Sequence, residues 1–415
     1  MVRLFLLWAI AASTFAIDPA GLAEHAHRRA ALRKALPDAI VALAGDGEPD
    51  RGGLRAGFFQ ESNFFYLTGW REPGAMLILT PDAEYFFLPA RNQVRERYTG
   101  PKIGPEDAGA AQASGFPNIA GAKAFPEKLR ELARGRTVYA LTKHPSADKV
   151  RQALDGQTLQ DAALPIARLR MVKSARELSL IQAATDASIA AHRAAWSRIA
   201  AGVHEYQLAA AFLHTMLDRG CERPAYAPIV GAGPNAIILH YSANRRRMDA
   251  GELLLIDAGA ECSAYAADLT RTLPVNGKFT PRQREIYEIV LGAQKAAIAA
   301  ARPGMKLTGH GEGTLNQIAL DYVNRHGKDR NGEKLGKYYL HQLGHHVGLD
   351  VHDPADPDMT LQPGMVVTIE PGLYIPEENI GVRIEDMVLI TENGVRVLST
   401  ALPREPGAVE KAIRR

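Results

Sequence analysis

Leu253-Leu254-Leu255-Ile256-Asp257 is the stretch that says most about this fold: four large apolar residues in a row that end at a carboxylate. So short an apolar run predicts a buried β-strand, in which an unpaired carboxylate is costly. A second acid, Asp268, follows eleven positions later in Tyr265-Ala266-Ala267-Asp268-Leu269-Thr270, beyond a turn-like segment from Gly259 to Ser263. Two strands joined by that turn bring both carboxylates to one face.

Two further acids have similar surroundings. Glu370 stands in Val366-Val367-Thr368-Ile369-Glu370-Pro371-Gly372, and Glu385 in Gly381-Val382-Arg383-Ile384-Glu385-Asp386. A single buried acid is most often paired with an arginine or with backbone N–H groups. Four of them in one domain repel one another unless cations neutralise them, and metal ions do so most directly. The acids therefore predict a metal site.

Histidines supply the remaining candidate ligands. Four of the thirteen histidines lie between residues 341 and 353, and another closes the apolar run Ile237-Ile238-Leu239-His240-Tyr241. A site dominated by carboxylates, with one imidazole, suits Mn²⁺, Co²⁺ or Fe²⁺ better than a thiolate-preferring metal. Four acids and one histidine are also enough to hold two ions, with one or two carboxylates bridging them.

Other motifs in the chain fail on inspection. Gly231-x-Gly233-x-x-Ala236 resembles a dinucleotide loop, but Ile237 to Tyr241 follows it and is strand-like. His204-Glu205 begins like a zinc-protease helix, but Leu208 occupies the place of the second histidine. The sequence also has no G-x-S-x-G nucleophile elbow.

Composition narrows the class of protein. The 415 residues predict two or three domains, and 46% hydrophobic with 23% charged residues is typical of a soluble globular protein. A net charge of +3 without a dense Lys/Arg run argues against nucleic acid as a partner. The two cysteines, Cys221 and Cys262, are far apart and form no C-x-x-C pattern. We expect no zinc ribbon or disulfide framework from them, but two isolated, buried thiols.

The amino terminus resembles a secretory signal. Arg3 precedes the apolar run from Leu4 to Ala12, and small residues follow. We expect residues 1–17 to be a signal peptide, with an amphipathic first helix as the alternative. The run is short for a bilayer span, and no later segment resembles one. A functional signal implies a secreted or periplasmic protein; without it, the chain is expected in the cytoplasm.

The predicted pattern of helices and strands changes near residues 164–172, which indicates a domain boundary. Residues 18–168 predict an α/β domain in which helices alternate with short strands. Residues 169–415 predict an α+β domain, in which Ser174 and Glu177 form a capping-box signature before a long helix. The expected helices are 25–36, 126–133, 146–154, 174–201, 203–219, 281–301 and 313–325. The expected strands are 39–44, 64–67, 75–79, 84–88, 137–141, 237–241, 253–258, 264–275 and a run between 338 and 397.

At its acids and histidines the sequence resembles the pita-bread metallopeptidases, a family that includes methionine aminopeptidase, prolidase and aminopeptidase P. Its phrases Ile256-Asp257-Ala258-Gly259, Asp268-Leu269-Thr270-Arg271-Thr272 and Arg383-Ile384-Glu385-Asp386 are similar to those of the family. So is the phrase from Thr368 to Tyr374. The resemblance implies five metal ligands: Asp257, Asp268, His345, Glu370 and Glu385.

Two further features resemble the proline-specific branch of this family. The segment from Gly344 to Asp353 is similar to that branch, in which the second histidine after the ligand is catalytic. Phe59 to Gly69, Glu72-Pro73 and Arg168 to Ser174 resemble the N-terminal domain of aminopeptidase P, a creatinase-like α/β domain. His346 departs from the pattern, because an apolar or aromatic residue is expected there.

The resemblance implies a Xaa-Pro aminopeptidase, a metallopeptidase that releases the first residue from peptides with proline at position two. Two divalent ions are implied, with Mn²⁺ favoured and Co²⁺, Fe²⁺ or Zn²⁺ as alternatives. Glu370 is expected to shuttle a proton as well as to bind metal. His240 and His352 are expected to donate hydrogen bonds to the substrate carbonyl and to the tetrahedral oxyanion.

The resemblance also implies residues that support the metal ligands. Arg383 and His341 are expected to support the metal ligands without binding metal themselves, with Arg383 pairing with a ligand carboxylate. Tyr374 is either part of the site or packed in the core. Two alternatives stay open: prolidase, which cleaves Xaa-Pro dipeptides by the same chemistry, and a pita-bread binding module without catalysis. The resemblance also implies a homo-oligomer, either a dimer or a tetramer.

Overall fold

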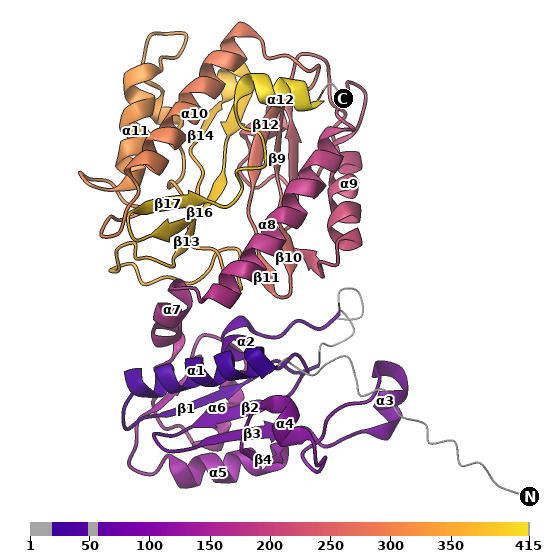
Figure 1. The fold of residues 1–415 in the computed structure, drawn as a ribbon, viewed down its shortest axis with the longest axis vertical. Coiled ribbons are helices and arrows are strands. Elements are labelled where there is room, and N and C mark those ends of the chain that lie inside the picture. Colours follow the sequence, from indigo (N-terminus) through magenta and orange to yellow (C-terminus); the bar gives the residue numbers. More distant parts are fainter. Residues whose placement is uncertain (1–18, 49–56, 414–415) are drawn as a thin grey trace, which may run out of the picture. The chain divides into compact units, whose positions relative to one another are not determined.

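A computed structural model describes residues 19–48 and 57–413 of the chain. The expected signal peptide, residues 1–17, lies outside them. The chain divides into two compact units, the first ending at Leu169 and the second beginning at Arg170. The first unit is an α/β domain and the second an α+β domain, as expected from the sequence (Figure 1).

The first unit contains six strands and the helices around them. Its helical elements are α1 (Pro19–Ala35), α2 (Ser62–Thr68), α3 (Gln93–Thr99), α4 (Ala110–Ser114), η2 (Ala122–Ala124), α5 (Phe125–Leu132) and α6 (Ala147–Ala153), and α7 (Ala163–Met171) crosses the division. Its strands are β1 (Ile40–Ala44), β2 (Met76–Leu79), β3 (Glu84–Leu88), β4 (Asn118–Gly121), β5 (Val138–Ala140) and β6 (Leu159–Asp161).

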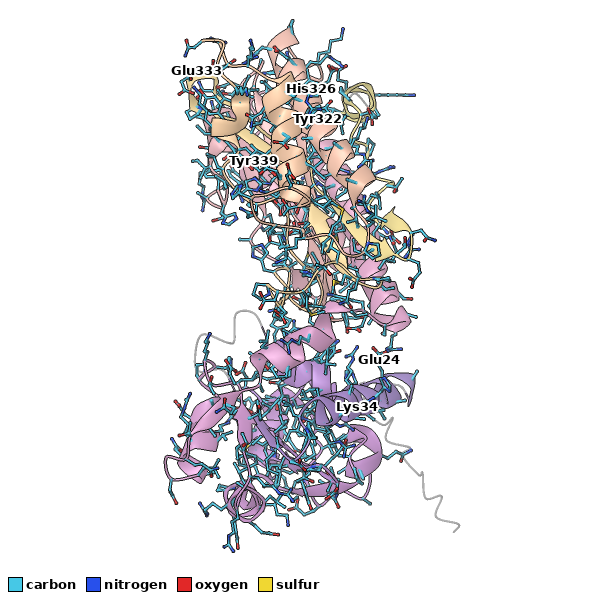
Figure 2. All side chains as sticks on the ribbon, turned by 90° about the vertical axis from the view of Figure 1, so that its left-hand side faces the viewer. Glu24, Lys34, Tyr322, His326, Glu333 and Tyr339 are labelled. Carbon is cyan, nitrogen blue, oxygen red and sulfur yellow. A yellow bond between two sulfur atoms is a disulfide. The ribbon has the colours of Figure 1, made fainter. Side chains whose placement is uncertain are left out.

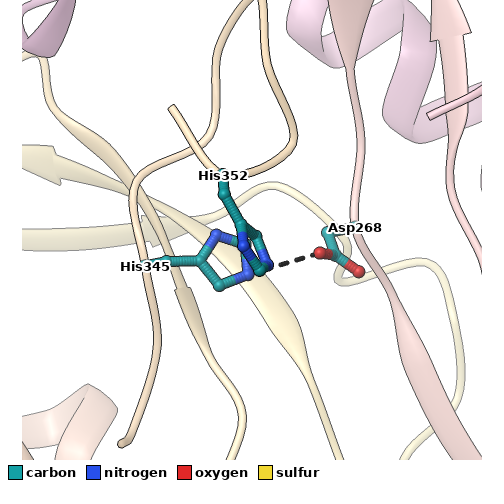
Figure 3. Close-up of side chains that lie close together, drawn as sticks. All are labelled: Asp268, His345 and His352. Carbon is teal, nitrogen blue, oxygen red and sulfur yellow. Dashed lines mark ion pairs between the residues drawn. The ribbon is translucent and has the colours of Figure 1, made fainter. Parts of the chain in front are cut away.

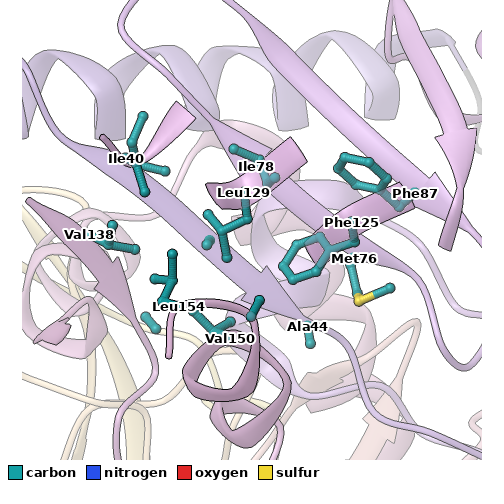
Figure 4. Close-up of a cluster of buried hydrophobic side chains, with 14 residues drawn as sticks. Ile40, Ala44, Met76, Ile78, Phe87, Phe125, Leu129, Val138, Val150 and Leu154 are labelled. Atoms are coloured by element: carbon teal, nitrogen blue, oxygen red, sulfur yellow. The ribbon is translucent and has the colours of Figure 1, made fainter. Parts of the chain in front are cut away.

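These strands form one mixed sheet in the order β4-β3-β2-β1-β5-β6. β1 is central and buried along its whole length, antiparallel to β2 and parallel to β5. Helices α5 and α6 cover one face of the sheet, where Phe125, Leu129 and Val150 pack on strand residues such as Ile40 and Ile78 (Figure 4). Burial of these apolar side chains is the main stabilising term of the first unit.

The prediction of a strand at residues 64–67 is wrong, because this stretch lies in helix α2. The Glu61 carboxylate accepts a hydrogen bond from the backbone N–H of Phe64, at 2.7 Å, and so caps the helix. Gly69, with φ of 67°, ends it in the left-handed conformation that glycine adopts without strain. These two local caps prevail over the β-propensity of the aromatic residues between them.

The second unit is built from pairs of helices and small antiparallel sheets. Its helical elements are α8 (Ala175–Trp196), α9 (Glu205–Asp218), η3 (Gly233–Ile237), α10 (Pro281–Ala300), α11 (Leu315–His326), η4 (Leu335–Tyr338), η5 (Pro376–Glu378) and α12 (Pro406–Ile413). Its strands are β7 (Arg223–Pro224), β8 (Ile229–Ala232), β9 (Leu253–Asp257), β10 (Ala260–Cys262), β11 (Tyr265–Ala266), β12 (Thr270–Pro274), β13 (Val366–Ile369), β14 (Gly372–Ile375), β15 (Ile380–Arg383), β16 (Asp386–Thr391) and β17 (Gly394–Val397).

Helices α8 and α9 pack together, as do α10 and α11, and Figure 1 shows strands of the unit between the two pairs. The capping box expected at Ser174 and Glu177 is present at the start of α8. Gly292 lets α10 and α11 approach closely, because a Cβ there would lie 2.2 Å from the hydroxyl of Tyr322. The Tyr322 ring in turn stacks on His326, one turn along α11 (Figure 2).

The strand predicted at residues 237–241 is also wrong. Gly233, with φ of 52°, and Pro234 begin the 3-10 helix η3, and a turn carries the chain on through His240. The strand expected over residues 264–275 is present in two pieces, β11 and β12, which are separated near Asp268. In the first case a glycine and a proline begin a helical turn just before the apolar run. In the second case the acid Asp268 lies between the two strands.

Cys221 and Cys262 form a disulfide, so the expectation of two isolated thiols is wrong. The pairing follows from the sheet, because β10 and β7 are antiparallel with Glu261 opposite Arg223. That register brings together cysteines 41 positions apart in the sequence, with their Cα atoms 4.2 Å from each other. Within the residues described, we find no helix with the length and apolar character that crossing a membrane requires.

Candidate metal centre

Four carboxylates meet where strands of the second unit come together. Asp257 is the last residue of β9 and lies opposite Thr270 of β12. Glu385, just before β16, is bridged to Thr270: its N–H donates to the Thr270 carbonyl at 3.1 Å. The Thr270 hydroxyl donates to the Glu385 carboxylate at 2.7 Å. Oxygens of Asp257, Asp268 and Glu385 thus lie within 4.8 Å of one another.

The turn between the two aspartates depends on a close approach of two backbone segments. A Cβ on Gly259 would lie 1.7 Å from the carbonyl oxygen of Ala267, so a larger residue would force the turn apart. The N–H of Ala258 donates to the carbonyl of Leu269, and that of Ala267 to the carbonyl of Ala260. The two carboxylates face each other because this turn is closed.

His345 and Glu370 complete the cluster from the other side. Nε2 of His345 lies 3.4 Å from a carboxylate oxygen of Asp268 and 3.4 Å from one of Glu370. The segment before His345 packs against the end of β13, and a Cβ on Gly344 would lie 2.1 Å from the Thr368 carbonyl. Nδ1 of His345 donates to the carbonyl of His346 at 3.1 Å, which leaves Nε2 available as a ligand atom.

The electrostatics of the cluster are those of a site that needs cations. Burial raises the pKa of Glu385 well above its usual range, and the charges of Asp268, Glu370 and Asp257 raise it further. Burial likewise raises the pKa of Glu370 to about 7. Burial opposes ionisation of His345, but the hydrogen bond with Asp268 and the charge of Glu370 raise its pKa to about 9. Buried acids that repel one another in this way are stabilised by nearby cations.

The residues present fit a pair of divalent cations. One carboxylate oxygen of Glu385 is buried without a hydrogen-bond partner among the described residues. Glu385 also belongs to two groups of converging ligand atoms, one with His345 and Glu370 and the other with Asp257 and Asp268. An orphaned buried carboxylate oxygen is costly, and oxygen-rich donor sets of this kind suit hard or borderline divalent metals.

Arg383, Tyr374 and His341 form a chain behind the carboxylates. The Arg383 guanidinium donates to the carboxylate of Asp257 and, at 2.6 Å, to the hydroxyl of Tyr374. Nε2 of His341 lies 2.8 Å from the same hydroxyl. Tyr374 is buried in the same apolar cluster as Leu255, and its hydroxyl contacts Arg383 and His341, so it both packs in the core and supports the residues behind the ligands.

His240 and His352 line a cavity of 500 Å³ whose wall also includes the five candidate ligands. The rings of His352 and His345 lie 4.1 Å apart, and both point toward Asp268 (Figure 3). His346 points elsewhere: it belongs to none of the ligand groups found among the described residues, and the charges that act on it include those of Lys173 and Asp353. The structure therefore offers His345, and not its neighbour, to the metal cluster.

Tyr226 is a residue of this site that sequence reasoning missed. Its hydroxyl contacts the carboxylates of both Asp257 and Asp268. Burial and the charges of the two aspartates raise the pKa of Tyr226 well above its usual value, so the phenol stays a proton donor. Tyr226 lies in the uncharged stretch Ala225-Tyr226-Ala227 without periodicity or a recognisable motif, so no local signal identifies it.

A cluster of four acids and one imidazole that can hold two divalent cations beside a cavity is typical of the class of metal-dependent hydrolases. Residues 179–392 match metallopeptidase family M24, and residues 25–139 match the N-terminal domain of aminopeptidase P. The chain belongs to metallopeptidase family M24, whose chemistry uses divalent metal ions.

Its relatives include enzymes of one named activity. The chain is 36% identical to the Xaa-Pro aminopeptidase of Haemophilus influenzae and 34% identical to that of Escherichia coli; each match covers 85% of this chain and 88% of the relative. Among solved structures it is similar to Escherichia coli aminopeptidase P with the inhibitor Pro-Leu, with a TM-score of 0.85 and 30% identity. That match covers 95% of this chain and 98% of the other.

Proposed function

We propose that this chain is a Xaa-Pro aminopeptidase, which hydrolyses the first peptide bond of substrates with proline at position two. The observation that carries the proposal is the cluster of four carboxylates and His345 in the wall of a cavity that His240 and His352 also line. Enzymes of this named activity are 34–36% identical to the chain over most of its length.

Two ions are proposed to share the cluster. Asp257, Asp268 and Glu385 would hold one of them, and His345, Glu370 and Glu385 the other. When bound, such a pair supplies an acidified water and polarises the scissile carbonyl. We propose Mn²⁺ as the native metal, with Co²⁺, Fe²⁺ and Zn²⁺ as alternatives, because carboxylate oxygens outnumber the single imidazole.

The protein's own residues handle protons and charge. Glu370 accepts a proton from the attacking water and delivers it to the leaving prolyl nitrogen. His240 and His352 donate hydrogen bonds to the substrate carbonyl and to the oxyanion that forms from it. Arg383 favours the ionised form of Asp257, since its guanidinium donates directly to that carboxylate. Tyr374 and His341 hold the guanidinium in place.

Selection of proline at position two would rest on shape. The bond before proline has a tertiary amide nitrogen, which lacks an N–H to donate. The cavity wall includes the apolar side chains of Ile229, Leu239 and Val351, against which a pyrrolidine ring can pack. The free amino terminus of the substrate is drawn to the acids and metals, which limits cleavage to the first bond.

A comparison of substrate lengths tests this proposal. The Mn²⁺-loaded chain should release the first residue from a Xaa-Pro-Yaa tripeptide; chelator should stop the reaction, and Asp268→Asn should abolish it. Asp321→Asn, on the exposed face of α11, serves as the matched control and should retain activity. Cleavage of Xaa-Pro dipeptides alone would identify a prolidase. No cleavage of either peptide would make the chain a binding module.

We further propose that the chain works outside the cytoplasm, either secreted or periplasmic. The signal-like pattern of residues 1–17 and the Cys221–Cys262 disulfide support this location, because disulfides persist mainly in oxidising compartments. Cell fractionation with mass analysis of the mature amino terminus tests it. A cytoplasmic chain that begins at Met1 would contradict it. The homo-oligomer that the resemblance implies stays a prediction. Light scattering, which measures the molar mass in solution, tests it.

A further inference from the structure

The catalytic candidate His240 stands on a segment with little regular structure. Residues 232–246 run from the end of β8 toward β9 and contain one short 3-10 helix, η3, followed by turns. His240 itself is exposed in the cavity, and no strand holds it. A donor that must meet a developing oxyanion needs placement to within a fraction of an ångström. Some other contact must therefore hold this segment.

Glu205, the first residue of α9, makes that contact. Its side chain is completely buried, and each carboxylate oxygen accepts two hydrogen bonds from this one segment. Oε1 accepts from the N–H of Ala232 and the side-chain amide of Asn235, both at 2.9 Å. Oε2 accepts from the hydroxyl of Tyr241 and the N–H of Arg246, both at 2.8 Å. One carboxylate thus binds both ends of the segment and its middle.

The contact in the middle lies immediately beside His240. Tyr241 follows it in the chain, and the tyrosine hydroxyl that donates to Glu205 also accepts a hydrogen bond from the N–H of Arg245, at 3.1 Å. The backbone N–H of Glu205 donates to the carbonyl of Arg246, at 3.0 Å, and reinforces the same end of the segment. Tyr241 is therefore fixed at its tip, and the backbone of His240 with it.

The number and direction of these donors explain why a carboxylate is needed. A glutamate in the first turn of a helix interacts favourably with the helix dipole, and it can do so from an exposed position. Burial of the charge costs free energy unless hydrogen bonds satisfy it. Here four donors converge, and the two backbone N–H groups cannot reverse their role. A glutamine would direct an NH₂ group at one of these pairs, so only an ionised acid accepts all four hydrogen bonds.

We propose that Glu205 is a positioning residue for the reaction, which fixes residues 232–246 and thereby the imidazole of His240. This inference rests on the role of His240 in the proposed function. It also gives a use to the His204-Glu205 pair: among the described residues, neither member belongs to a group that could hold a metal. Glu205 is thus a structural support for the site, and the pair is not a zinc motif.

Two variants test this role. Glu205→Gln should lower kcat on a Xaa-Pro-Yaa tripeptide about 10- to 100-fold, the range expected for a misplaced donor, with KM and bound metal unchanged. Tyr241→Phe removes only the contact beside His240 and should lower kcat by a smaller factor. In the metal-free protein, both variants should speed hydrogen exchange at the amides of residues 232–246. If Glu205→Gln does not fold, Tyr241→Phe carries the test.

Glu177→Gln is the matched control. Glu177 is also a buried glutamate in the first turn of a helix, where it accepts a hydrogen bond from a tyrosine hydroxyl, that of Tyr265. The Glu177 carboxylate accepts hydrogen bonds from the N–H of Ser174 and from the hydroxyl of Tyr265, both outside the segment that carries His240. This control should leave kcat and the exchange of residues 232–246 unchanged.

A double-mutant cycle with His240→Ala decides whether Glu205 acts through His240. In the His240→Ala background, Glu205→Gln should change kcat less than twofold, because the donor it positions is gone. An equal loss in both backgrounds, or faster exchange without any loss of kcat, would overturn the inference while leaving the aminopeptidase activity intact. If His240→Ala alone retains full kcat, the proposed role of His240 fails and the inference fails with it.

Discussion

Arg383 and Tyr226 both donate to Asp257, one with a full positive charge and one with a phenolic hydroxyl. The sequence indicates the first of these partners, because Arg383 lies two positions before an acid in a recognisable phrase. It does not indicate the second, because Tyr226 is distant in sequence from both carboxylates that it contacts. Single residues are thus predictable when their chemistry is charged and their motif local, and not when only the fold brings them together.

Removal of Arg383 should destabilise the metal-free protein more than the metal-loaded protein. Arg383→Met leaves Asp257 buried without its cationic partner, which costs about 3 kcal/mol of unfolding free energy. Bound divalent ions supply positive charge and should recover part of that loss. Urea unfolding with and without Mn²⁺ measures both values. The exposed Arg247, in Arg247→Met, is the control; an equal loss in the two variants would contradict the assignment.

Tyr226→Phe should weaken metal binding without unfolding the chain. The phenol hydroxyl donates to two proposed ligands, and loss of a hydrogen bond behind ligands typically costs about 10- to 100-fold in metal affinity. Calorimetric titration with Mn²⁺ measures the change. Tyr206→Phe, at a half-exposed position on α9, should bind as the unaltered chain does. Equal affinities for all three proteins would show that the hydroxyl does not support the ligands.

At the scale of elements, the sequence predicts those whose signals agree with one another. The helix expected from Ser174 is present as α8, because its capping box and apolar pattern indicate the same start. The apolar composition of residues 64–67 and 237–241 predicts strands, but helix caps at the first stretch and a glycine with positive φ before the second outweigh it. The disulfide was missed because its partners become neighbours only through the pairing of β7 with β10.

That disulfide should stabilise the turn that joins the two aspartates. Cys262 ends β10, which lies between Asp257 and Asp268 in the chain. A cross-link between residues 41 positions apart lowers the entropy of the unfolded chain. This stabilises the folded chain by about 4 kcal/mol. Cys221→Ser with Cys262→Ser should therefore unfold at clearly lower urea concentration than the oxidised chain, and about as readily as the reduced chain. Identical midpoints for the oxidised chain and the double variant would contradict this role.

At the scale of the whole molecule, the two units carry different tasks. The first has its own sheet and core, and the second holds every candidate ligand. The family relation spans both, since the matches lie at residues 25–139 and 179–392. The sequence predicts the α/β and α+β classes of the two units because periodicity and turn residues are local signals. Side-chain contacts within each unit, such as those of Glu205, depend on the finished fold.

The first unit should lose stability in mild acid. Burial, together with the nearby charge of Arg28, lowers the pKa of His25 from 6.5 to about 4. The folded state therefore binds fewer protons than the unfolded state between these values, so its stability is full above pH 6.5 and falls toward pH 4. From pH 7 to pH 5 the loss is about 2 kcal/mol.

Urea unfolding of the full chain at the two pH values measures this loss. His25→Gln should flatten the dependence, because the titrating group is gone, whereas His27→Gln, at an exposed position on the same helix, should not. A slope that persists in His25→Gln would assign the acid sensitivity to other groups.

The most direct measurement of the central claim is the release of the first residue from two peptides that differ only at position two. Chain loaded with Mn²⁺ is incubated with Xaa-Pro-Yaa and with Xaa-Ala-Yaa, and the free amino acid is quantified by mass spectrometry. We predict release from the proline peptide that stops on addition of chelator, with little release from the alanine peptide. Equal release from both peptides, or release that survives chelator, would contradict a two-metal aminopeptidase specific for proline at position two.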